Sequence, residues 1–232
     1  MVWPRYLLYF VGIALIAWML TQLEISFPGS LHMQLVLNAG DALGTSEFSP
    51  VELIQPLILA ACGLLMAWVG RHCSSQRPIA APFGAIALIF LIRELDYFID
   101  RFVINNLGQV LIAVVCALAI VYTYRHRRRL WIAWGRVWPS PGLALIFAGA
   151  IVLFAYVHLV GQESFWMALL GDDYRRVIKL AVEEFFELIG YLMWLIGTIE
   201  YTYQAKAIAY REPKPAAQRL RQKRRQDKEG QY

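Results

Sequence analysis

Acidic and basic side chains gather in two otherwise apolar stretches of the sequence, and their types suit cation or proton binding. The first set closes the stretch 78–100 and comprises Arg93, Glu94, Asp96 and Asp100. The second set opens the stretch 177–200 and comprises Lys179, Glu183, Glu184 and Glu187. Carboxylates that share a buried site favour a bound proton or a bound cation, because burial and like charge both oppose ionisation.

The surrounding chain is strongly apolar. Of its 232 residues, 59% are hydrophobic and 17% are charged, and the mean hydropathy is +0.47. A soluble domain has about a quarter charged residues, whereas helical segments of about 20 apolar residues can cross a bilayer. The composition therefore predicts an all-α, polytopic integral membrane protein. It excludes a soluble enzyme, a secreted disulfide scaffold and a β-barrel.

Six transmembrane helices are expected within a membrane domain of residues 1–203. Their approximate ranges are 6–23, 53–70, 78–100, 102–124, 140–161 and 177–200. The third and sixth have short uncharged parts, so both must carry ionisable residues into the membrane. Residues 204–232 form a basic tail, which we expect to be drawn to anionic lipid.

The distribution of Lys and Arg predicts the orientation of these spans. Seventeen of the 22 basic residues fall on one side, and the loop 22–50 on the other side has none. Positive loops are cytoplasmic, so we expect both termini in the cytoplasm. The chain contains no N-x-S/T sequon, which is compatible with a bacterial plasma (inner) membrane.

The two charged helices run in opposite directions, so both charged sets should lie in the outer half of the membrane. We expect Arg93 to pair with Glu183 or Glu187, and Lys179 to reach Glu183 one turn away. Acids still outnumber bases, and His158 lies at a similar depth in the fifth span. The expected cation- or proton-binding residues are Glu94, Asp96, Asp100, His158, Glu183, Glu184 and Glu187. A divalent metal ion would take Asp96, His158, Glu183 and Glu187.

A second feature precedes the fifth span, where a short segment contains both arginines and tryptophans. The residues are Arg127, Arg128, Arg129, Trp131, Trp134 and Trp138. Tryptophans spaced by three and four lie on one helical face, which is typical of an interfacial helix. We expect this helix on the cytoplasmic surface of the bilayer, with no nucleic acid as partner. No haem or nucleotide site is expected.

Three functions remain open from the sequence. The first is an outward-facing cluster that binds a cation or couples protons, in a transport role. The second is a non-catalytic subunit or assembly factor of a membrane complex, in which the charges merely fix helix packing. The third is a metal-dependent membrane hydrolase acting on lipid. The sequence does not decide whether the chain is an enzyme.

Overall fold

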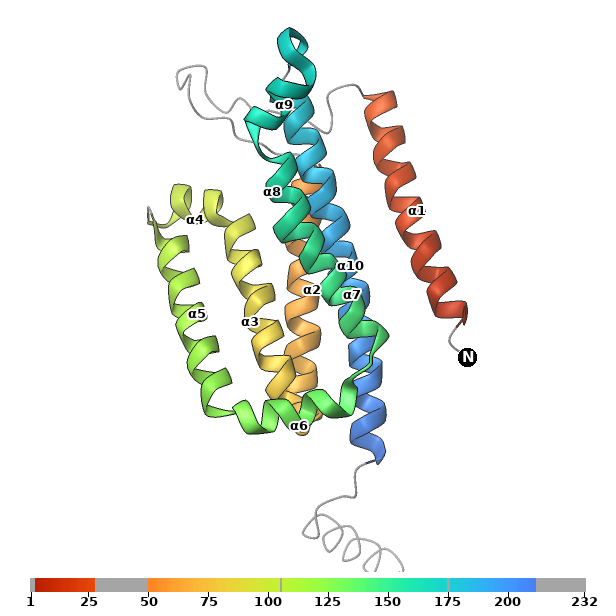
Figure 1. Ribbon diagram of the computed structural model, residues 1–232, viewed down its shortest axis with the longest axis vertical. Coiled ribbons are helices and arrows are strands. Elements are labelled where there is room, and N and C mark those ends of the chain that lie inside the picture. Colours follow the sequence, from red (N-terminus) through yellow and green to blue (C-terminus); the bar gives the residue numbers. More distant parts are fainter. Residues whose placement is uncertain (1–2, 28–49, 105, 175, 212–232) are drawn as a thin grey trace, which may run out of the picture.

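The computed structural model describes residues 3–27, 50–104, 106–174 and 176–211. All regular secondary structure in these ranges is helical, which confirms the all-α prediction. The expected outer loop 22–50 and the basic tail 204–232 lie mostly outside the described residues. Figure 1 shows long helices standing side by side, with short helices at both ends of the bundle.

Four helices in the described ranges are long and apolar enough to cross a membrane. They are α1 (Trp3–Ser26), α2 (Pro50–His72), α5 (Leu107–Arg125) and the helix Pro141–Val160. The start of the last helix follows from its sequence. Ser140 accepts a hydrogen bond from the Leu143 amide, and Pro141 occupies the first turn, where its missing N–H is not needed.

Two further long helices carry the charged sets. They are α3 (Arg77–Glu94) and α10 (Arg176–Arg211). α3 packs between α2 and α5, while α10 packs along α7 (Pro141–Ile151) and α2. α10 extends beyond the expected end at residue 200, because Ala, Gln and Lys are good helix formers.

Short breaks interrupt two of the expected spans. The third ends as a helix at Glu94, and α4 (Asp96–Phe102) starts after Leu95. The fifth contains the π-helix η2 (Val152–Tyr156) before α8 (Val157–Val160). A π-turn inserts an extra residue and rotates everything after it. Beyond it lie α9 (Glu163–Leu170) and η3 (Gly171–Asp173), between the fifth and sixth expected spans.

Glycines bring α7 and α10 into close contact. A Cβ atom at Gly142 would lie 2.6 Å from the Tyr201 nitrogen, and one at Gly197 would lie 2.7 Å from the Gly142 oxygen. About two helical turns further along α7, a Cβ at Gly149 would lie 2.7 Å from the Gly190 oxygen. Both helices therefore repeat glycine every seven residues and meet backbone to backbone, as membrane helices with small residues at their interface do.

The peripheral helices α6 and α1 differ in how they meet this bundle. α6 (Arg127–Val137) crosses the end of the bundle between α5 and α7 (Figure 1) and buries Ala133 and Val137. α1 stands apart from the other long helices (Figure 1), and most of its apolar side chains are exposed. Its main polar attachment is Glu200 of α10, which accepts hydrogen bonds from Arg5 at 3.1 Å and from Tyr9 at 2.8 Å.

Candidate functional site

Arg93 stands at the centre of a polar network between α3 and α10. Its Nη2 donates to Glu187 Oε1 at 2.7 Å, to Glu94 Oε1 at 2.9 Å and to the Tyr191 hydroxyl at 3.1 Å. The Tyr191 hydroxyl donates in turn to Glu94 Oε1 at 2.6 Å. One guanidinium is thus shared by two carboxylates, and a buried tyrosine closes the ring. We call these four side chains the Arg93 network.

Helix geometry explains why these residues meet. Glu187 and Tyr191 are four residues apart and lie on one face of α10. Arg93 and Glu94 form the last turn of α3, which runs antiparallel to α10, so they arrive at the same level. The two carboxylates are largely enclosed, with side chains 12% and 15% exposed, whereas Arg93 is 47% exposed. The guanidinium therefore closes the open side of the network.

Aromatic rings lie under the network, toward the end of the bundle that carries α6. The Phe90 ring contacts the rings of Tyr191 and Trp194, each at 5.9 Å between centroids. The Arg93 guanidinium lies over Phe90 at 5.5 Å, a favourable cation–π distance. Phe90 and Trp194 are both buried. These rings therefore form an apolar layer next to the Arg93 network.

Further along α10, Lys179 Nζ lies 3.7 Å from Glu183 Oε2, the pairing expected from their spacing. The Glu183 carboxylate also contacts Gly161, where a Cβ atom would lie 2.9 Å from Oε1. Glu184 is half-buried, and its backbone carbonyl accepts from the buried Gln55 amide at 3.5 Å. The Glu183 side chain of α10 therefore lies near the end of α8, and the Glu187 side chain lies toward α3.

Asp96 and Asp100 lie on α4, outside the Arg93 network. The Asp96 carboxylate packs on Gly108 of α5, so closely that any Cβ at that position would overlap it. The break at Leu95 explains this placement, since on an unbroken helix the spacing of Arg93, Asp96 and Asp100 would put all three on one face. Each aspartate has a buried Oδ1 atom with no hydrogen-bond partner among the described residues.

His158 is exposed on α8, while its neighbours Val157 and Val160 are buried. The sequence analysis placed His158 by depth alone, which does not determine the face of the helix on which it lies. Within the described ranges, no three His, Cys, Asp or Glu side chains come together in a group able to hold a metal ion. The structure therefore does not gather Asp96, His158, Glu183 and Glu187 around one point.

Comparison of the chain with protein-family models, curated proteins and solved structures finds no match. The geometry of the residues carries the functional argument.

Tyr191 is the member of the network that the sequence analysis missed. Its signal was its position four residues after Glu187, on the face that carries the acids. Glu200, which the sequence analysis did not single out, is also a paired buried group, since its side chain is 7% exposed. Its partner Arg5 is separated from it by 195 residues, and no local pattern connects the two.

The Arg and Trp residues of α6 form a second polar surface. Trp131 and Trp138 are exposed, and Trp134 stacks on Trp138 at 5.9 Å while its edge meets Phe147 of α7. Arg127, Arg128 and Arg129 are exposed at the corner where α5 turns into α6. Ala133, Val137 and the half-buried Trp134 face the bundle, so Trp131, Trp138 and the three arginines lie on the exposed side.

Proposed function

We propose that the chain crosses the membrane six times, with α3 and α10 joining the four apolar spans. Their charged residues argue for this arrangement, because Glu94 and Glu187 are largely enclosed and both pair with Arg93. An ionised side chain facing the bilayer centre would cost at least about 2.5–3.5 kcal/mol. Helix packing agrees, since α3 and α10 run alongside α2 in the middle of the bundle.

The proposed orientation places α6 and both chain termini in the cytoplasm. Basic residues gather at the α6 end of the bundle, in the turn between α2 and α3 and in the corner between α5 and α6. The Arg93 network then lies in the outer half of a plasma membrane, open to the outside. The aromatic rings of Phe90 and Trp194 separate it from the cytoplasmic half.

The function we propose is the binding of a proton by the Arg93 network, in an ion-coupled role such as transport. The observation that carries it is the sharing of one guanidinium by two carboxylates. Fully ionised, the network would hold an extra negative charge in a poorly hydrated place, and a single proton removes it. We prefer a proton to a metal ion because the described residues offer no group of three metal ligands.

A non-catalytic subunit of a larger membrane complex is the second candidate. The observation that favours it is the position of α1, which contacts the bundle sparingly and leaves a long apolar face exposed. Under this reading the Arg93 network only fixes the packing of α3 against α10. The metal-dependent hydrolase has no comparable support.

The two candidates differ in how stability responds to pH. If the folded protein holds a proton that the unfolded chain releases at neutral pH, its free energy of unfolding falls as pH rises, by up to about 1.4 kcal/mol per pH unit. Glu94→Gln and Glu187→Gln each leave one carboxylate for one guanidinium, so each variant should lose this slope. Glu163→Gln, at an exposed position on α9, is the matched control and should keep it.

Thermal melting of the purified protein across pH measures the slope. A parent protein whose melting temperature is flat between mildly acidic and mildly basic pH would remove the proton site and leave the packing role.

A further inference from the structure

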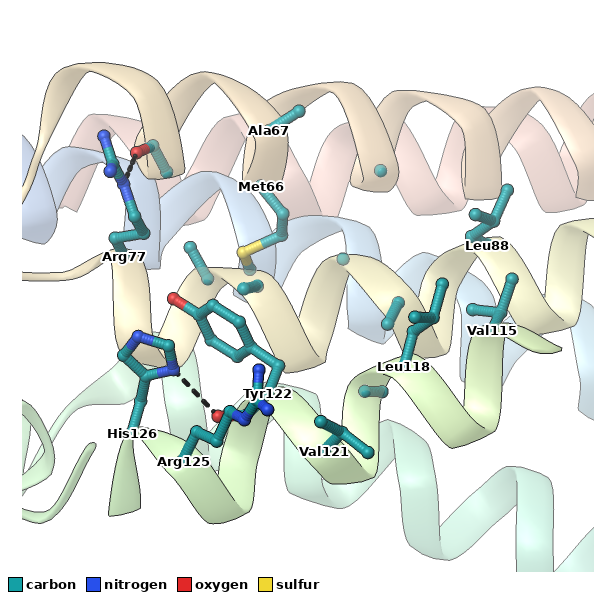
Figure 2. Close-up of a pocket in the computed structure, with 17 residues that line it drawn as sticks. Met66, Ala67, Arg77, Leu88, Val115, Leu118, Val121, Tyr122, Arg125 and His126 are labelled. Carbon is teal, nitrogen blue, oxygen red and sulfur yellow. Dashed lines mark hydrogen bonds between the residues drawn. The ribbon is translucent and has the colours of Figure 1, made fainter. Parts of the chain in front are cut away.

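A groove runs between α2, α3 and α5 on the side of the bundle away from α1, outside the Arg93 network. It encloses about 830 Å³, and eight of its 17 lining residues are Gly or Ala. Small side chains leave room between the helix backbones, which is why the space exists. Figure 2 shows Leu88, Val115 and Leu118 toward one end and Arg77, Arg125 and His126 at the other.

Two of the lining glycines have no close packing neighbour among the residues that the structure describes. A Cβ atom at Gly63 or at Gly70 would meet nothing within 4 Å. This contrasts with Gly142 and Gly197, which are needed for the contact between α7 and α10. Glycine within a helix costs about 1 kcal/mol relative to alanine. The absence of side chains at Gly63 and Gly70 leaves the groove open, at this cost in helix stability.

The groove carries positive charge at one end only. Its polar end has Arg77, Arg125 and His126, and none of the 17 lining residues is acidic. In the part of the chain that the structure describes, neither Arg77 nor Arg125 forms an ion pair with a carboxylate. An anion is therefore the complement of this end, and a hydrocarbon chain is the complement of the other.

These basic groups are held in place by the backbone. Arg77 Nε donates to the Gly70 carbonyl at 2.6 Å, which fixes the guanidinium beside the groove (Figure 2). The His126 ring stacks on the Tyr122 ring, with 4.3 Å between centroids, and its Nδ1 lies 2.9 Å from the Tyr122 carbonyl oxygen. Arg125 and His126 also line a polar recess of about 390 Å³ with the next three arginines. The groove thus continues into a basic recess wide enough for a headgroup.

The length of the groove matches one leaflet of a bilayer. Arg77 and Leu88 are eleven residues apart on α3, which corresponds to about 16 Å at 1.5 Å per residue. The hydrocarbon core of a bilayer is about 30 Å thick, so the groove covers about half of it. Its charged end lies at the α6 surface, where headgroups of the cytoplasmic leaflet would lie under the proposed topology.

We propose that this groove binds an anionic phospholipid of the cytoplasmic leaflet. One acyl chain lies along the small residues of α2 and α3, and the phosphate lies between Arg77, Arg125 and His126. This goes beyond the proton site: it uses the proposed topology, but not the Arg93 network. A zwitterionic lipid of equal chain length binds less well, because its headgroup carries no net charge for the two arginines.

The test compares phosphatidylglycerol with phosphatidylcholine on the full-length protein. The protein is transferred from vesicles containing both lipids into native mass spectrometry, and retained lipids are counted. The parent should retain one phosphatidylglycerol in preference to phosphatidylcholine. Gly63→Leu, which fills the groove, and the double variant Arg77→Gln with Arg125→Gln should each lower that preference about tenfold or more.

Matched controls separate this groove from general effects. Gly12→Leu adds the same side chain on α1, where a Cβ also meets nothing within 4 Å. Arg71→Gln removes a cation at the end of α2 that does not line the groove. Both should retain phosphatidylglycerol like the parent. Because Gly63 has open space around it, Gly63→Leu should fold, and an unchanged melting temperature in lipid-free detergent checks this.

Three results would overturn the proposal. Equal retention of the two lipids by the parent would mean that the groove holds bulk lipid only. Loss of preference in the arginine double variant but not in Gly63→Leu would place the lipid on the α6 surface instead of in the groove. A disulfide between Ala67→Cys and a second protein chain, formed in the native membrane, would show that a protein helix fills the groove.

Discussion

Arg93 of α3 and Glu187 of α10 are 94 residues apart in the sequence, and their side chains meet at 2.7 Å between Nη2 and Oε1. The same nitrogen serves Glu94 and the hydroxyl of Tyr191. This contact joins the two helices that carry most of the charge within the bundle. It accounts for how both can lie among apolar spans, and it leaves one carboxylate more than there are guanidinium groups.

Removing the guanidinium should destabilise the protein more than removing the neighbouring cation of α10. Arg93→Gln leaves Glu94 and Glu187 without their charged donor, and hydrogen bonds to charged groups contribute about 1.5–3 kcal/mol each. Lys179→Gln removes a single pair at 3.7 Å within one helix, for which about 0.5 kcal/mol is expected. Denaturation in mixed micelles compares the two variants. Equal losses would mean that the Arg93 network does not hold α3 to α10.

The glycine contact between α7 and α10 predicts opposite effects of the same substitution at two sites. Gly197→Ala places a Cβ 2.7 Å from the Gly142 oxygen and 2.8 Å from the Ile146 nitrogen. These are backbone atoms, so the helices must separate, at a cost of about 1–3 kcal/mol. Gly12→Ala meets open space, and improved helix propensity should make it neutral or slightly stabilising. A stable Gly197→Ala would show that α7 and α10 are not packed this closely.

Cysteine labelling in intact cells tests the six spans and their direction. With Cys116 replaced by alanine, Glu163→Cys and Asn106→Cys should react with a membrane-impermeant maleimide. Ser74→Cys and Tyr210→Cys should react only after permeabilisation. Ser74 and Asn106 flank α3, so labelling of both from the same side would mean that α3 does not cross. Inverted labelling of all four would reverse the proposed orientation.

The fold could largely be predicted from the sequence because apolar length and helical period are local properties. The start of the fifth span at Ser140-Pro141 and the pairing of Lys179 with Glu183 depend on residues within one helical turn. The division of the third span at Leu95 could not be foreseen, because residues 93–101 keep good helical character and no proline or glycine marks the break. Packing of Asp96 on Gly108 favours the turn, and that contact belongs to a different helix.

The candidate site was predicted in part for the same reason. The depth of each residue along two antiparallel helices was enough to predict that Arg93 lies near the acids of α10. It did not distinguish Glu187 from Glu183, because they lie on the same face one turn apart. His158 was grouped with the acids by its depth in the fifth span, but depth does not say which way a side chain faces, and His158 is exposed. Arg5 and Glu200 were missed because only tertiary packing brings α1 to α10.

We propose that the Arg93 network, with two carboxylates and one guanidinium, holds one proton. Infrared spectroscopy of the protein in lipid at neutral pH detects it through the carbonyl stretch of a neutral carboxylic acid. The parent should show this band with a shift in heavy water, Glu94→Gln and Glu187→Gln should each lose it, and Glu163→Gln should retain it. Identical carbonyl spectra for the parent and both network variants would show that the two carboxylates are ionised, and would contradict the proton site.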